Sequence, residues 1–156
     1  MNPSAAGALT SFAALAALGV AYYAQHVMFL VPCELCLYER WPYRITLAFG
    51  ILAVLAGRFG GRQILGLAAL AMLGDVLIAG THVGVEFGFW KSPLPECNGE
   101  LVPGAPLPMF PAVPCDRPVY LIHHLPVSMA MMDFCFALVF TLTLGAYVLR
   151  KPRRFS

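Results

Sequence analysis

The chain has 156 residues, of which 60% are hydrophobic and only 12% are charged, and its formal net charge is +2. A soluble domain is closer to about half apolar and about a quarter charged, so this composition excludes an ordinary soluble domain and indicates an integral membrane protein. The small net charge gives no indication of nucleic-acid binding, and we expect no nucleic-acid partner.

Four apolar runs predict an all-α protein in which residues 1–156 form a single membrane domain with four transmembrane helices. A bilayer core of about 30 Å requires about 20 helical residues. The first run carries no charged side chain and lacks the basic start of a cleaved signal peptide, so we expect it to remain as a span. The predicted spans cover approximately residues 5–31, 33–57, 64–83 and 127–149.

The second span raises a question about its beginning. The apolar run from Tyr43 to Gly57 is short for a bilayer, so we expect the helix to begin near Pro32 or Cys33. Proline suits the first turn of a helix, because its missing N–H would be unpaired there. Pro42 would then either kink the helix or mark a break just before it, and the sequence leaves both possibilities open.

The basic residues predict the orientation of the bundle. Arg58 and Arg62 lie in a short glycine-rich turn, and residues 150–156 form a basic tail, so both segments and both termini are expected in the cytoplasm. The Cys33–Arg40 stretch and residues 84–126 then lie on the opposite side, which in a bacterium is the oxidising periplasm. Residues 84–126 hold nine of the thirteen prolines, which predicts a long, extended periplasmic loop.

Five cysteines remain to be explained. The first two form a Cys-x-x-Cys pair at the membrane edge, two more lie in the proline-rich loop, and the last, inside the fourth span, is expected to be a small buried apolar residue. These residues are Cys33 and Cys36, Cys97 and Cys115, and Cys135. A Cys-x-x-Cys pair can close a disulfide or, with a second pair, hold a metal.

Three interpretations of the two pairs were weighed. Structural disulfides alone are disfavoured for the first pair, because a bridge between Cys33 and Cys36 closes a very small loop and constrains the unfolded chain little. Zinc is disfavoured, because Cys97 and Cys115 are too far apart in sequence for the usual second close pair. Redox chemistry is favoured, because a helix N-terminus stabilises a thiolate.

Arg40 strengthens the redox interpretation. It follows Cys36 by four residues, so on a helix it lies on the same face, where a guanidinium could stabilise a thiolate or donate to a carbonyl of a bound oxidant. The alternative is an interfacial anchor or an ion-pair partner of Glu39 or Glu34. The chain has no haem, flavin or dinucleotide motif, so a lipid-soluble quinone is the natural electron acceptor at this depth.

Two stretches resemble one known family. Gln25-His26-Val27-Met28, followed by Pro32-Cys33-x-x-Cys36-x-Tyr38-Glu39-Arg40, is similar to the disulfide bond formation protein B (DsbB) family of bacterial quinone-linked membrane oxidases. The four spans, the short cytoplasmic turn and the second cysteine pair agree with this resemblance.

The resemblance implies an electron path. Cys97 and Cys115 would take electrons from a periplasmic DsbA-type thiol oxidase through a mixed disulfide at Cys97. The reduced pair would then exchange with Cys33 and Cys36, and Cys36 would contact ubiquinone or menaquinone beside Arg40. The implied location is the bacterial inner membrane, with the redox cysteines on the periplasmic side.

Other polar residues admit two roles each. His82 and Glu86 are four residues apart and are candidates for a family histidine near the end of the third span, although a histidine there is more often an interfacial anchor. Asp75 and Asp133 lie inside predicted spans, where hydrogen bonding between helices is favoured over a proton relay.

Rival functions were also considered. Within the same chemistry, a DsbI-like oxidase would serve one dedicated partner. A vitamin K epoxide reductase type is disfavoured by the Tyr38-Glu39-Arg40 run. From a different class, a small transporter or scaffold would carry structural disulfides, with Asp75 and Asp133 along a path.

Overall fold

A computed structural model describes residues 2–98, 113–121 and 126–150 of the chain. The middle of the proline-rich loop and the basic tail lie outside the described residues, so the expectations for those segments stay predictions. Within the described residues every regular element is a helix. The elements are α1 (Pro3–His26), α2 (Glu34–Ala56), the short 3-10 helix η1 (Gly57–Phe59), α3 (Gly61–Glu86), the short 3-10 helix η2 (Pro95–Asn98) and α4 (Met129–Leu149).

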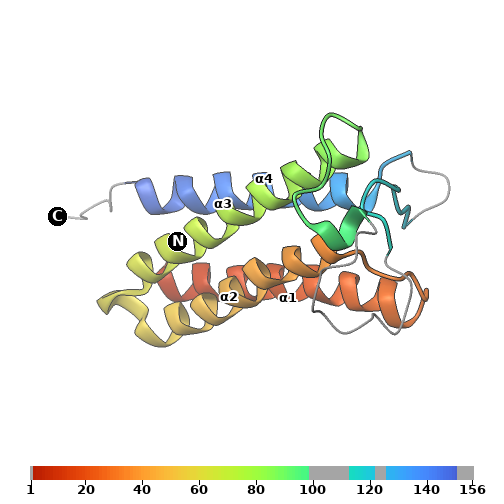
Figure 1. Ribbon diagram of the computed structural model, residues 1–156. Helices are drawn as coiled ribbons and strands as arrows, with labels where there is room; N and C mark the ends of the chain where they lie inside the picture. Colours follow the sequence, from red (N-terminus) through yellow and green to blue (C-terminus); the bar gives the residue numbers. More distant parts are fainter. Residues whose placement is uncertain (1, 99–112, 122–125, 151–156) are drawn as a thin grey trace, which may run out of the picture.

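The four long helices are each long and apolar enough to cross a membrane. This confirms the predicted fold class, an all-α membrane protein with four membrane-spanning helices. Helices that are neighbours in sequence pack against one another, α1 on α2, α2 on α3 and α3 on α4 (Figure 1).

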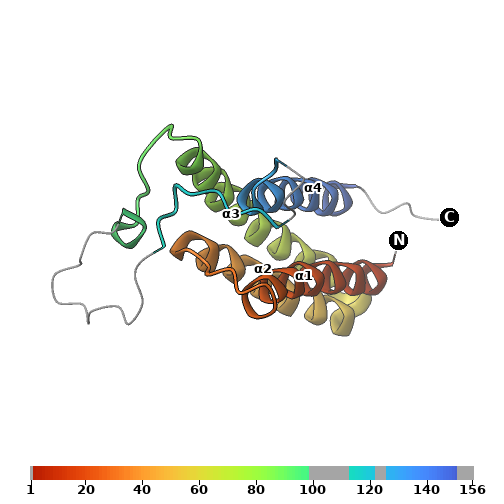
Figure 2. The ribbon, with the colours of Figure 1, turned by 90° about the vertical axis from the view of Figure 1, so that its right-hand side faces the viewer.

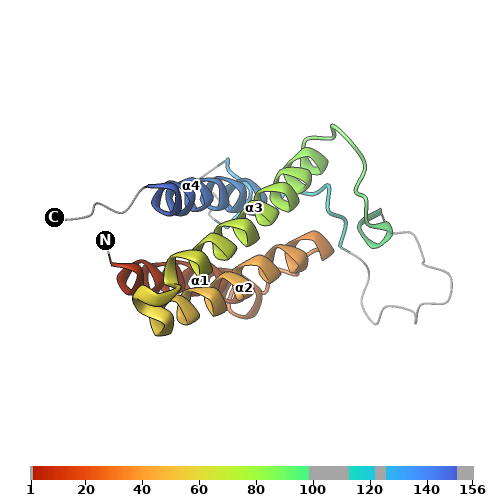
Figure 3. The same ribbon diagram turned by 90° about the vertical axis from the view of Figure 1, so that its left-hand side faces the viewer.

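The bundle has two distinct ends. The start of α1, the turn at η1 and the end of α4 lie together, and we call this the turn end (Figure 1). The opposite end, which we call the cysteine end, carries the start of α2, η2 and residues 113–121. Figures 2 and 3 show η2 and residues 113–121 beyond the same ends of α2 and α3.

Side-chain caps fix where three helices begin. The Oδ1 atom of Asn2 accepts from the N–H of Ser4 ahead of α1, and the Oγ atom of Ser128 accepts from the N–H of Met131 at the start of α4. Cys33 does the same for α2 through its sulfur. Short polar side chains are favoured at this position because they satisfy backbone donors that have no partner inside the helix.

Pro42 neither ends nor begins a helix. The α2 helix runs without a break from Glu34 to Ala56 with Pro42 inside it, which answers the question left open by the sequence. The start of this helix agrees with the expected position near Cys33. The first helix ends at His26 rather than near Val31, so the apolar residues after His26 form the connection to α2 instead of a further turn.

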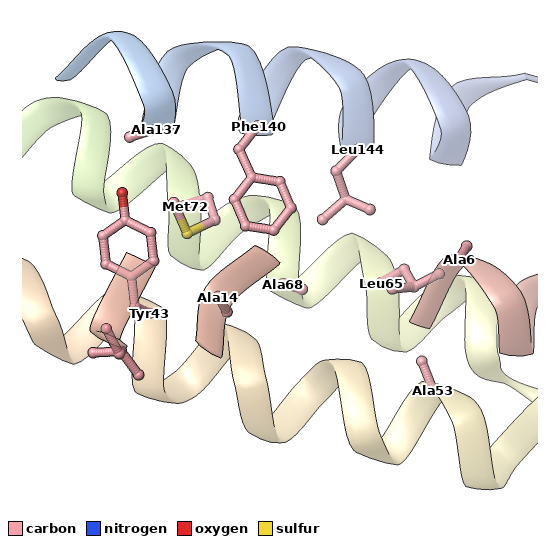
Figure 4. Packing of buried hydrophobic residues seen from close by; sticks show 11 residues of the cluster. Ala6, Ala14, Tyr43, Ala53, Leu65, Ala68, Met72, Ala137, Phe140 and Leu144 are labelled. Carbon is pink, nitrogen blue, oxygen red and sulfur yellow. The ribbon is translucent and has the colours of Figure 1, made fainter. Parts of the chain in front are cut away.

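The core between the helices is built from small and medium-sized side chains. Figure 4 shows Ala6, Ala14, Ala53 and Ala68 packed among larger residues from α2, α3 and α4. The helices α1 and α2 approach closely, since a Cβ atom added to Gly7 would lie 2.7 Å from the carbonyl oxygen of Gly50. Small residues allow helix backbones to approach closely in a membrane.

One sequence-based expectation for α4 was wrong. Cys135 was expected to be buried, but it is exposed on the outer face of the bundle. The neighbouring core positions of α4 are Ala130, Ala137, Phe140 and Leu144, so the helical period turns Cys135 away from the other helices. In a membrane this face lies against lipid, where a thiol is still an acceptable apolar side chain.

Candidate redox site

The Cys-x-x-Cys pair lies at the first turn of α2. Cys33 is the residue just before the helix, and its Sγ atom accepts a hydrogen bond from the backbone N–H of Cys36 at 3.3 Å. The sulfur thus occupies the position of a capping oxygen, next to the positive end of the helix dipole. Cys33 is buried and Cys36 is partly exposed, and both are free thiols.

A histidine and a glutamate extend this site into the bundle. His82 Nε2 lies 3.6 Å from Cys33 Sγ, and Glu39 Oε1 accepts from the other ring nitrogen, Nδ1, at 2.7 Å. All three side chains are buried. A carboxylate that accepts from Nδ1 fixes the orientation of the ring, and the protonated ring also donates from Nε2 to the Cys33 thiolate.

These contacts favour the ionised form of Cys33. A hydrogen bond from the Cys36 side chain is the largest cause that lowers the pKa of Cys33, to about 5, and contact with His82 adds to it against the opposing effect of burial. Each contact favours the thiolate, which is the nucleophile in disulfide exchange. That Cys36 is the thiolate in contact with a quinone, as the resemblance implies, stays a prediction. In the free dithiol the stabilising contacts converge on Cys33.

The second cysteine pair is a closed disulfide at the same end of the bundle. Cys97 comes from η2 and Cys115 from residues 113–121, with their Cα atoms 5.0 Å apart. Both are buried in one apolar cluster with Cys33, Leu35 of α2 and Val85 of α3, and Cys36 packs against this cluster. The fold therefore gathers all four predicted redox cysteines in one place.

Arg40 lies one turn beyond Cys36 and is buried. Its Nη1 atom donates to the side-chain oxygen of Gln25 at 2.6 Å, and its guanidinium lies 5.1 Å from the ring centroid of Tyr22. Both partners belong to α1. Arg40 thus bonds to an amide rather than to Glu39, whose carboxylate is engaged by His82. Among the described residues Arg40 has no carboxylate partner, so its positive charge is available to a ligand.

A pocket of about 90 Å³ opens beside these residues. Its walls are largely apolar, including Leu18, Ala21, Leu30 and Met129, and all four long helices also contribute polar groups to it. These polar groups include Cys33, Cys36, Arg40, Gln25, Tyr43, His82 and Asp133. Apolar walls and a guanidinium donor suit a flat apolar ring with carbonyl oxygens, so the donor set fits a quinone.

The donors also bear on metal binding. The sulfur atoms of Cys33 and Cys36 and a ring nitrogen of His82 lie within 4.8 Å of one another, so these three could hold a soft metal ion. A zinc site made from all four cysteines, considered from the sequence, does not fit this arrangement, because Cys97 is bonded to Cys115.

Sequence reasoning missed most of the partners in this site. It named His82 and Glu86 as candidates for one role, and the structure shows that His82 bonds to Glu39 and that Glu86 accepts from Ser128. Glu39 was named only as part of a motif and as a partner for Arg40. The sequence could have indicated Glu39 as a site residue, because it lies one helical turn from Cys36 on α2. The position of His82 could not be predicted in this way, because it depends on how α3 packs against α2.

Comparisons with known proteins identify the family of the chain. The family model described as "Disulfide bond formation protein DsbB" matches residues 3–147. A disulfide bond formation protein B from Ralstonia nicotianae is 27% identical over 94% of this chain and 94% of its own length. A protein of the same name from Herminiimonas arsenicoxydans is 32% identical over 49% of this chain and 48% of its own.

Two further comparisons add less. An uncharacterized protein from Rickettsia prowazekii is 29% identical over 46% of this chain and 41% of its own length. No solved structure matches the chain significantly.

Helical spans that carry a dithiol and a neighbouring disulfide at one end define a membrane protein built for thiol–disulfide chemistry. With nearly its whole length matched by the family model, the chain belongs to the DsbB family of disulfide bond formation proteins. Membership implies thiol oxidoreductase activity and favours this function over a transporter or a scaffold.

Proposed function

We propose that the protein reoxidises a periplasmic DsbA-type thiol oxidase and passes the electrons through its two cysteine pairs to ubiquinone or menaquinone in the bacterial inner membrane. One observation carries the proposal: Cys33, Cys97 and Cys115 share one buried cluster, with Cys36 and Arg40 at the adjoining pocket. A DsbA-type couple is strongly oxidising, with a reduction potential of about −120 mV, so only an acceptor of high potential can take up its electrons.

The first steps take place at the loop disulfide. A thiolate of the partner attacks Cys97, breaks its bond to Cys115 and forms a mixed disulfide. The second thiol of the partner resolves this bond, so the partner leaves oxidised and Cys97 and Cys115 become a dithiol. Each exchange moves two electrons and leaves the number of disulfides unchanged.

The reduced loop then exchanges with the membrane pair. A loop thiolate attacks Cys33 in the Cys33–Cys36 disulfide and releases Cys36 beside the pocket. The other loop thiolate closes the Cys97–Cys115 bond again and releases Cys33. The lowered pKa of Cys33, to about 5, makes it a good leaving group, because thiols of low pKa leave faster. The resulting arrangement, a closed loop disulfide and two free thiols on α2, is the one in the structure.

Residues of the pocket serve the final transfer. A quinone bound there accepts two electrons and two protons as the Cys33–Cys36 disulfide forms again. Arg40 is positioned to donate to a carbonyl oxygen of the ring, and Gln25 holds the guanidinium in place. The apolar walls exclude water from the reacting sulfur.

Turnover by the purified full-length protein in detergent tests the proposal. A reduced DsbA-type protein and a short-chain ubiquinone should be converted together, and Cys36→Ala and Cys97→Ala should each abolish the conversion. Cys135→Ala is the matched control, because this thiol lies outside the bundle, and it should retain activity. Full turnover in both Cys36→Ala and Cys97→Ala would show the proposal to be wrong.

A further inference from the structure

Two aspartates from different helices lie around one tyrosine in the interior of the bundle. The hydroxyl of Tyr43 on α2 donates to Oδ1 of Asp133 on α4 at 2.7 Å. Asp75 on α3 is completely buried and interacts electrostatically with both Tyr43 and Asp133. Figure 4 shows the Tyr43 side chain extending from α2 toward α4.

The oxygens of these carboxyl groups are poorly satisfied. Both side-chain oxygens of Asp75 and the second oxygen of Asp133 are buried without a hydrogen-bond partner. An ionised carboxylate in such surroundings is very costly, whereas a protonated one is tolerated. Negative charges on both Asp75 and Asp133 would also repel one another.

Among the described residues no basic side chain bonds to Asp75 or Asp133, although Arg40 lines the same pocket as Asp133. The ionisable side chains that face Asp133 and Asp75 are Tyr43 and Glu39 from α2 and His82 from α3. The ring of His82 is already engaged by Glu39 and Cys33. From α1, residues 3–21 contain no ionisable side chain at all. The pair therefore holds at least one proton within the bundle.

This proton lies next to the pocket. Asp133 and Tyr43 both line the pocket that Cys36 and Arg40 also line, while Asp75 lies behind Tyr43 in the core. Arg40 can polarise a carbonyl oxygen but keeps its own protons, because a guanidinium stays charged in proteins. A carboxylic acid at the pocket wall can release one.

We propose that Asp133, Tyr43 and Asp75 form a proton-donating site for the pocket, in which Asp133 gives a proton to the acceptor oxygen as it is reduced. This inference rests on the proposed function. As the disulfide forms, the two sulfurs lose two electrons, the Cys36 thiol loses one proton, and the protonated His82 ring beside the Cys33 thiolate loses the other. The quinone gains two electrons and two protons, so the overall reaction is balanced. Asp133 lends one proton to the acceptor, with its negative charge then stabilised by the Tyr43 hydroxyl and by Asp75.

The lent proton is restored from the thiols. His82 contacts Cys33, and Glu39 contacts His82. Glu39 also lines the pocket with Asp133, so polar groups connect the sulfur to Asp133 and can return the proton. No external acid is required. The sequence alone favoured hydrogen bonding between helices as the role of Asp75 and Asp133. An asparagine would make such hydrogen bonds equally well, so this role does not explain two acidic side chains whose oxygens are largely unpaired.

Asp→Asn substitutions separate the two roles. Asp133→Asn keeps an oxygen that accepts from Tyr43 but removes the acidic proton. In a single turnover of the pre-reduced full-length protein with short-chain ubiquinone, we expect Asp133→Asn to slow quinone reduction about 100-fold, as for loss of a general acid. The rate should also lose its dependence on pH and its solvent isotope effect. Asp116→Asn, on the exposed part of the loop, is the matched control and should not change the rate.

Infrared spectroscopy gives a readout that needs no turnover. The wild-type protein should show the carbonyl band of a buried carboxylic acid at neutral pH, and Asp75→Asn or Asp133→Asn should remove or shift this band. The inference is overturned if the band is missing from the wild type, or if Asp133→Asn reduces quinone at the wild-type rate.

The two proposals fail differently. If the wild type exchanges thiols with its partner but never reduces quinone, the proposed function is wrong, and the proton-donating role falls with it. If wild-type turnover is normal and Asp133→Asn has no effect, only the proton-donating site is wrong. Exchange of Asp133→Asn with the reduced partner, measured without quinone, should match the wild type and so exclude misfolding.

Discussion

Cys33 has a double role that follows from its place before a helix. Its sulfur both caps α2 and receives the contact from His82, so the same contacts that start the helix also favour the thiolate. Burial alone would oppose the charge. Chemical reactivity at this residue is therefore linked to local folding: a change that frays the first turn of α2 also removes a donor from the sulfur.

The charge state of Cys33 can be measured directly. In the reduced protein we expect one thiolate to form as the pH rises through about 5, because the pKa of Cys33 is lowered to that value. An ordinary cysteine ionises near pH 8.5, so the lowered pKa means that Cys33 should be almost fully ionised at neutral pH. Thiolate absorbance in the ultraviolet, followed against pH, reports this transition.

Substitutions assign that transition to its residue. Cys33→Ser should remove the midpoint near pH 5, and His82→Asn should raise it, while Cys135→Ser should leave it in place. A wild-type protein in which no thiolate forms below about pH 8 would contradict the assignment.

Arg40 and Arg44 form a matched pair for testing recognition of the acceptor. Arg40 lines the pocket, whereas Arg44 is exposed, donates to the hydroxyl of Tyr22 and lies over the ring of Trp41. We expect Arg40→Met to raise the KM for quinone about 10-fold or more, because a hydrogen bond from a charged donor contributes about 1.5–3 kcal/mol. Arg44→Met should stay close to the wild type.

Thiol exchange provides the second readout for this pair. Oxidation of the reduced partner by the loop disulfide, measured without quinone, should be nearly unchanged in Arg40→Met, because Arg40 is not part of the cysteine cluster. Equal KM changes in the two arginine variants would mean that Arg40 acts through general surface charge and not through the pocket.

At the scale of the helices, the contact between α1 and α2 depends on two glycines. A Cβ atom at Gly7 would lie 2.7 Å from the Gly50 oxygen and 3.0 Å from the backbone nitrogen of Val54. Both are backbone atoms and cannot turn away as a flexible side chain could. This contact matters for the site, because α1 carries Gln25 and α2 carries Arg40 and both cysteines of the dithiol.

We therefore expect Gly7→Ala to destabilise the protein. Forcing a methyl group into a closely packed interface costs about 1–3 kcal/mol. Thermal unfolding of the purified protein in detergent should show a lower midpoint. Gly19→Ala is the control on the same helix, since nothing lies within 4 Å of the added methyl group, and it should be neutral or slightly stabilising. A loss of the same size in Gly19→Ala would point to helix propensity and not to packing.

The helices could be predicted from the sequence more fully than their contacts. The existence and order of the four spans followed from hydropathy, because each run of apolar residues must pair its own backbone inside a bilayer. The continuation of α2 through Pro42 could not be predicted, because it depends on whether neighbouring helices hold the interrupted turn in place. The pairing of His82 with Glu39 and of Tyr43 with Asp133 needs the rotation of three helices, which hydropathy does not specify.

On the scale of the whole molecule, the chemistry is confined to one end. The dithiol, the disulfide and the pocket gather at the cysteine end, while the turn end is closed by contacts of a different kind. There, Arg62 at the start of α3 donates twice to the carbonyl oxygen of Val148 near the end of α4, at 3.0 and 2.7 Å. A cation at the end of a helix binds carbonyls that lack an intrahelical partner.

This division makes the orientation in the membrane decisive. Electron transfer from a periplasmic partner requires the cysteine end to face the periplasm, and the basic residues of the turn predict the cytoplasm for the opposite end. Two exposed positions report the ends separately: Phe59 in the turn and Tyr120 in the segment after Cys115. Phe59→Cys and Tyr120→Cys, each made without the other free thiols, give single labelling sites.

In spheroplasts, a membrane-impermeant maleimide should label Tyr120→Cys and leave Phe59→Cys unlabelled, and inverted vesicles should give the reverse. Both positions are exposed and lie outside the four long helices, Phe59 in η1 at the turn end and Tyr120 in residues 113–121 at the cysteine end. Labelling of Phe59→Cys from the periplasmic side would place the cysteine pairs in the cytoplasm. No periplasmic thiol could then reach the loop disulfide, and the oxidase proposal would have to be abandoned.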